Sequence, residues 1–72
     1  MKATPYFTNS VLGRRPYLTV EMCEAVLADP VKREVQPDGR VRCWGRVGDH
    51  WLRVVVDGDA LHNAFFDRGF NP

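Results

Sequence analysis

The stretch from Arg40 to Asp57 alternates arginine or tryptophan with apolar residues, a pattern typical of paired β-strands. Gly48-Asp49 lies near its middle and suits a two-residue hairpin turn, because glycine tolerates the positive backbone angles that such turns require. In this hairpin alternate side chains point to opposite faces. One face then carries four arginines and two tryptophans, namely Arg40, Arg42, Trp44, Arg46, Trp51 and Arg53.

This face combines two kinds of side chain that suit single-stranded RNA. An arginine fork matches phosphate oxygens bidentately, and an aromatic ring or guanidinium plane can stack an unpaired base with about 1 to 3 kcal/mol. The plainer interpretation is that arginine and tryptophan are good cross-strand neighbours on a solvated face, joined by cation–π contacts of about 0.5 to 1 kcal/mol. Two tryptophans left in water would form an apolar patch, however. A third interpretation is therefore that the C-terminal tail, with Phe65, Phe66 and Phe70, covers this face and makes it a second core.

Catalytic residues are harder to find. The sequence has no nucleophile elbow, no phosphate-binding glycine loop and no paired metal motif. RNA can nevertheless be cleaved through its own 2′-hydroxyl, for which a protein supplies a base, an acid and cations that stabilise the phosphate. His62 and Arg68, together with the sheet arginines, are the candidate catalytic residues. The alternative for His62 is a strand histidine hydrogen-bonded in the core, and His50, beside the turn, is expected on the surface.

The cysteines and histidines do not predict a metal site. Cys23 and Cys43 are too few for a disulfide framework and are not spaced as zinc ligands are, so both are expected to be small buried apolar residues. His50 and His62 are twelve positions apart and give no dense ligand cluster. We therefore expect neither a metal nor another cofactor.

The composition indicates one small globular domain. The chain has 72 residues, of which 44% are hydrophobic and 26% charged, unlike a disordered chain. No apolar run is long enough to span a membrane and the N-terminus lacks the apolar core of a signal peptide, so a cytoplasmic protein without a membrane partner is expected. The net charge is only +1, but between Lys32 and Arg53 six basic residues stand against three acidic ones.

Two helices are expected before the sheet. Asn9 or Ser10 can cap a first short helix, and Thr19 is a good N-cap for a second one. Apolar residues of the second helix share one face, which should cover the sheet. That face consists of Met22, Cys23, Val26 and Leu27.

The sheet is expected to be an antiparallel meander of three or four strands. A two-residue hairpin turn sets Val47 opposite His50 and Trp44 opposite Arg53. The next loop can hold two or three residues, so the register of the last strand, and with it the face of His62, stays open. The fold class is therefore α+β, with N-terminal helical segments packed on one face of the meander. The expected segments are an extended arm (1–9), a helical part (10–29), an antiparallel sheet (31–66) and a tail (67–72).

Several stretches together carry a family resemblance: Arg15 to Thr19, the helix up to Asp29-Pro30, Asp38 to Gly45, Leu52 to Val56 and His62 to Arg68. With these motifs the chain resembles small bacterial proteins related to BrnT-like and RelE/ParE-like toxins. The resemblance implies helices that precede an antiparallel sheet, endoribonuclease activity on messenger RNA, either free or on the ribosome, and a cognate antitoxin that holds the protein inactive. It extends to His62, Arg68 and the sheet arginines as site residues.

The sequence thus favours a toxin-like component of a bacterial toxin–antitoxin system that binds or cleaves RNA with its arginine–tryptophan face. Enzymatic activity stays open at this point. The alternative is a non-enzymatic protein-interaction module or a homodimer that uses the same face, because tryptophan and arginine are enriched at binding hot spots.

Overall fold

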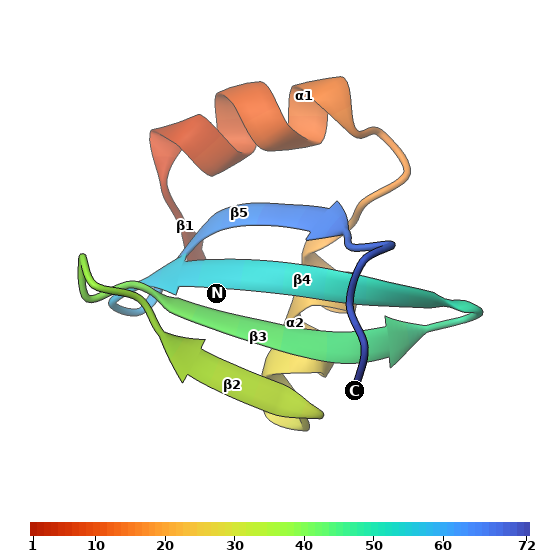
Figure 1. The fold of residues 1–72 in the computed structure, drawn as a ribbon. Coiled ribbons are helices and arrows are strands. Elements are labelled where there is room, and N and C mark those ends of the chain that lie inside the picture. The colour runs from red at the N-terminus through yellow and green to blue at the C-terminus, as the bar shows by residue number, and fades with distance from the viewer.

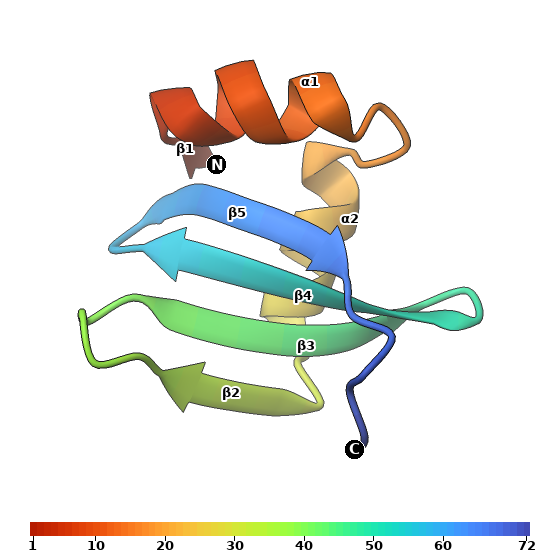
Figure 2. The same cartoon turned by 45° about the horizontal axis from the view of Figure 1, so that its top comes forward.

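A computed structural model describes residues 1–72 and shows an α+β fold in which two short helical segments pack against a five-stranded sheet (Figure 1, Figure 2). No helix is both long enough and apolar enough to cross a membrane. In chain order the elements are β1 (Lys2–Ala3), η1 (Phe7–Val11), α1 (Leu12–Arg14), α2 (Val20–Ala28), β2 (Lys32–Val35), β3 (Val41–Val47), β4 (His50–Asp57) and β5 (Ala60–Phe66).

The strands lie in the order β1-β5-β4-β3-β2. The α+β class is confirmed, and β2 to β5 form the antiparallel meander that the sequence predicts. The prediction missed β1, which runs parallel to β5 and sets Lys2 opposite Ala60 and Ala3 opposite Leu61. A strand of two residues is too short to show the alternation of apolar and polar residues by which strands are predicted.

The central hairpin of β3 and β4 has the predicted register. Val47 lies opposite His50, and Trp44 lies opposite Arg53. Gly48 has a φ of 59°, whereas no residue other than glycine has a positive φ. A two-residue turn with glycine at its first central position matches the right-handed twist of the flanking strands, which explains why this register forms.

The turn between β4 and β5 resolves the register that the sequence left open. Gly58 has a φ of 61°, and Asp57 pairs with Ala60, so the connection holds two residues. The register then shifts between Val55 and Val56. The extra residue of this β-bulge is His62, because Leu61 and Asn63 are the partners on either side of it.

Helix α2 covers the inner face of the sheet as its apolar stripe predicts. Thr19 caps it, since its Oγ1 accepts a hydrogen bond of 3.1 Å from the backbone N–H of Met22. Cys23 and Val26 are buried in one core with residues of β3, β4 and β5. Gly45 allows the close approach, because a Cβ on it would lie 3.0 Å from a methyl carbon of Val26.

The first helix begins earlier than expected, so the prediction of an extended arm over residues 1–9 is wrong. The Oγ1 of Thr4 accepts a 3.1 Å hydrogen bond from the backbone N–H of Phe7, which makes Thr4 an N-cap with Pro5 at the first helical position. Phe7 and Val11 are fully buried in the same core as α2. The helix therefore starts within the expected arm because Phe7, one turn before Val11, is needed to complete the core.

Candidate nucleic-acid interface

The arginines and tryptophans lie on the face of the sheet that points away from α2, which we call the outer face. Figure 1 shows α2 behind the sheet and the C-terminal tail crossing β4 and β3 in front of it. The tail is attached at its root by a hydrogen bond of 2.8 Å from the backbone N–H of Asp67 to the carbonyl of Trp51. Part of the outer face is therefore covered by residues 67–72.

Trp44 is the residue that the tail covers most completely. Its ring stacks on Phe70 at a centroid distance of 5.1 Å and an interplanar angle of 13°, and its Nε1–H donates a 2.9 Å hydrogen bond to Oδ2 of Asp67. Only 6% of Trp44 is exposed. Trp51 meets the edge of the Phe70 ring at 5.2 Å and stays half-buried. Of the two predicted stacking residues, Trp51 is thus accessible and Trp44 is part of a small second core.

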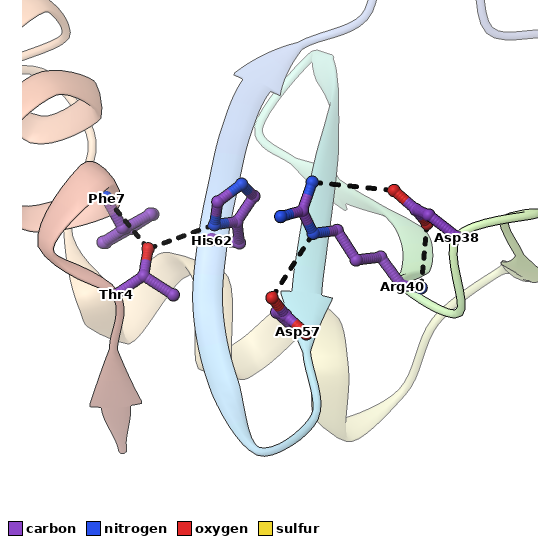
Figure 3. A network of polar contacts seen from close by, with 6 residues as sticks. All are labelled: Thr4, Phe7, Asp38, Arg40, Asp57 and His62. Carbon is purple, nitrogen blue, oxygen red and sulfur yellow. Dashed lines mark hydrogen bonds and ion pairs between the residues drawn. The ribbon is translucent and has the colours of Figure 1, made fainter.

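Arg40 and Arg42 have their charges balanced by carboxylates. Arg40 lies between Asp57, 3.4 Å from its Nε, and Asp38, 3.6 Å from its Nη1 (Figure 3). The Nε of Arg42 lies 2.8 Å from Oε1 of Glu34. Hydrogen bonds from the side chains of Lys32 and Arg42 lower the pKa of Glu34, so this carboxylate stays ionised opposite its partners. These two arginines have little free charge for a ligand.

Arg46 and Arg53 make no ion pair. The guanidinium of Arg46 is exposed and lies 5.1 Å from the ring centre of Trp51. That of Arg53 lies between two rings, 5.6 Å from Trp44 and 5.1 Å from Phe65, and its Nε is buried without a hydrogen-bond partner. The uncompensated positive charge of the outer face therefore lies at these two residues, each over an aromatic ring.

His62 lies at the edge of the same face. Its Nδ1 is 3.2 Å from Oγ1 of Thr4 (Figure 3). The centre of its ring lies 5.2 Å from that of Tyr6. Together with Tyr6, Arg40 and Arg53 it lines a shallow pocket of about 260 Å³. The hydrogen bond between Nδ1 and Oγ1 of Thr4 holds the ring, and no group of the protein bonds to Nε2.

Arg68, the other predicted catalytic residue, is not near His62. It follows the C-terminal end of β5, whereas His62 lies near the start of that strand, and the two line different pockets. The four strand steps from His62 to Phe66 alone span roughly 13 Å. Sequence reasoning also missed Phe65 and Tyr6, which flank Arg53 and His62. Alternation along β5 could have suggested Phe65, but only with its register known.

No protein-family model matches this chain, and no curated protein or solved structure does either. Function must therefore be inferred from the side chains themselves. Histidine, cysteine and carboxylate residues do not gather in any group of three or more that could hold a metal ion.

Proposed function

We propose that this protein binds single-stranded RNA on the outer face, as a toxin-like component of a bacterial toxin–antitoxin system. The observation that carries the proposal is Arg53, a cation without a carboxylate partner, held between the rings of Trp44 and Phe65 with its Nε unsatisfied. A buried donor without a partner costs about 1 to 3 kcal/mol. The side chain as a whole is half-buried, so a phosphate oxygen would approach the part of the guanidinium that stays accessible.

Arg46 and Trp51 extend the site along the hairpin. Arg46 lies directly opposite Trp51, and their cation–π contact sets a second guanidinium without an ion pair beside a half-exposed indole. An unstacked base can lie against such a ring, but a base inside a duplex cannot reach it. The combination of free guanidinium groups and accessible rings therefore favours single strands over duplexes.

Cleavage of the bound strand would use His62. Its free Nε2 and the guanidinium of Arg53 border the same pocket, which suits a base that takes the proton of a 2′-hydroxyl and a cation that stabilises the phosphate. Tyr6, against the His62 ring, offers a hydroxyl as a proton donor. In this arrangement Arg53 replaces the more distant Arg68 as the partner of His62.

The direct test is binding of a labelled single-stranded oligoribonucleotide to the purified protein at about 50 and 200 mM salt. Arg46→Gln and Arg53→Gln should each weaken binding about tenfold and reduce the salt slope by about 0.7, the value for one phosphate contact on a single strand. Arg33→Gln is the matched control, because Arg33 is exposed, makes no ion pair and points to the opposite face of β2. Absence of salt-dependent binding to RNA, with and without ribosomes, would refute the proposal.

Two further measurements separate the parts of the proposal. Expression of an active toxin should arrest growth, and His62→Gln should relieve the arrest while leaving RNA binding intact. The second measurement is the mass of the protein in solution. If the protein is a dimer that Trp51→Ala dissociates, and if it binds no RNA, the outer face is a protein interface instead.

A further inference from the structure

A second pocket lies at the other end of β5, between the connection from α1 to α2, the start of β4 and the end of β5. It measures about 600 Å³ and is lined by Arg15, Tyr17, His50, Phe65, Phe66 and Arg68. Figure 2 shows that the α1–α2 connection and the end of β5 lie on the same side of the molecule. This volume lies in the range of small-molecule sites, roughly 300 to 1,000 Å³.

The walls of this pocket are held by aromatic packing. The Tyr17 ring stacks on Phe66 at 5.6 Å with an interplanar angle of 20°, and the His50 ring lies tilted at 53° to Phe66 at a centroid distance of 5.3 Å. The pocket is therefore bounded by a fixed aromatic row from three separate parts of the chain. A flat ring of a ligand would find a matching surface there.

The two charged side chains that line this pocket are both arginines. The side chains of Arg15 and Arg68 make neither an ion pair nor a hydrogen bond within the protein, and Nη1 of Arg15 is shielded from solvent without a partner. None of the six lining residues is acidic. Asp49 and Asp67 line a smaller adjoining pocket of about 220 Å³, and Asp67 is already bonded to Trp44 and to the backbone N–H of Gly69.

We propose that this pocket binds the phosphate group of a nucleotide. Two guanidinium forks and the His50 ring supply donors for a phosphate dianion, and arginine is the side chain best suited to bind it bidentately. The aromatic row would hold the attached base. Neither Arg46 nor Arg53 lines this pocket, so the pocket can bind a nucleotide even if the outer face binds no RNA.

The first experiment measures binding of uridine 5′-monophosphate, uridine and inorganic phosphate by calorimetry on the full chain. The mononucleotide should bind at least tenfold more tightly than uridine, because the nucleoside lacks the dianion. Arg15→Gln and Arg68→Gln should each weaken mononucleotide binding at least fivefold. Arg14→Gln is the matched control, because Arg14 is the neighbour of Arg15 but bonds to Tyr6 and Ser10 instead of lining the pocket.

The outcomes separate this inference from the proposed function. Equal binding of uridine and its monophosphate, or equal weakening by Arg14→Gln and Arg15→Gln, would overturn the phosphate pocket. Arg68 is exposed, so its substitution tests the site even where Arg15→Gln disturbs folding. A loss of mononucleotide binding in Arg53→Gln as large as that in Arg68→Gln would place the phosphate on the outer face instead.

A last comparison identifies the source of the phosphate. An oligoribonucleotide with a 5′-phosphate and the same strand without it are titrated against wild type and Arg68→Gln. If the 5′-phosphate increases the affinity of wild type for the strand, and this increase disappears in Arg68→Gln, the pocket binds the end of an RNA strand. No such gain, with the mononucleotide still bound, assigns it to a free nucleotide.

Discussion

Replacing Phe70 by alanine should destabilise the fold and uncover Trp44. Phe70 stacks on Trp44 at 5.1 Å and meets Trp51 edge-on at 5.2 Å. Each such aromatic pair contributes about 0.5 to 1.5 kcal/mol beyond the area that it buries, so the two together contribute about 1 to 3 kcal/mol. Phe70 is half-buried, which puts the expected loss below the 3 to 5 kcal/mol typical of a fully buried phenylalanine.

The assay is urea denaturation followed by tryptophan fluorescence, with thermal unfolding as a second readout. A loss of 1 kcal/mol lowers the melting temperature of a domain of this size by about 4 to 8 °C. The emission of the folded variant should also shift to the red, because Trp44 loses its cover. Phe70→Leu keeps an apolar side chain over Trp44 but no ring, so its free energy of unfolding should fall less than that of Phe70→Ala. Asn71→Ala is the control, because Asn71 is an exposed neighbour of Phe70. Stability within about 0.5 kcal/mol of wild type and unchanged emission would show that the tail does not hold Trp44 in solution.

Three further predictions concern the fold that supports the outer face. Gly45→Ala should cost about 1 to 3 kcal/mol, because its Cβ would lie 3.0 Å from a methyl carbon of Val26, and the loss should shrink when Val26→Ala is added; an additive double variant would contradict the contact. Thr19→Ala should cost about 0.5 to 2 kcal/mol in chemical denaturation, since it removes the hydrogen bond to the N–H of Met22, and a neutral result would show that this cap is not needed. Burial raises the pKa of the Cys23 thiol to about 11 from an ordinary 9.0, so the unfolded chain releases this proton first as the pH rises. The free energy of unfolding should therefore fall by roughly 1 to 3 kcal/mol between pH 9 and 11, and a fall of the same size in Cys23→Ala would contradict that assignment.

The central hairpin could be predicted in detail because three local signals agree. Alternating apolar residues, a glycine at the first position of a two-residue turn and the apolar stripe of α2 all require the register that sets Trp44 opposite Arg53. The start of the first helix was missed although Thr4 and Pro5 form an ordinary N-cap pair. Asn9 and Ser10 are equally good caps by residue type, and only the burial of Phe7 decides between them.

The candidate site could be predicted only as a set of side chains on one face. Which arginines keep a free charge depends on partners on other strands, such as Asp57 of β4 for Arg40 and Glu34 of β2 for Arg42. The cover over Trp44 depends in the same way on the path of the tail. Such contacts arise from the assembled sheet, and no local pattern specifies them.

The β-bulge is the other feature that the sequence could not specify. It places one extra residue in β5, so His62 turns toward the outer face while Leu61 and Ala64 both stay in the core. Alternation alone would have placed Leu61 and Ala64 on opposite faces. The position of His62 beside Arg53 follows from this irregularity.

The measurement that tests RNA binding on the outer face most directly is a nitrogen–proton NMR titration with a single-stranded oligoribonucleotide. The indole N–H signal of Trp51 and the side-chain Nε–H signals of Arg46 and Arg53 should shift in proportion to the RNA added. The indole N–H of Trp44, which is buried and bonded to Asp67, should move much less. Shifts confined to α2, or none at saturating RNA, would contradict the account.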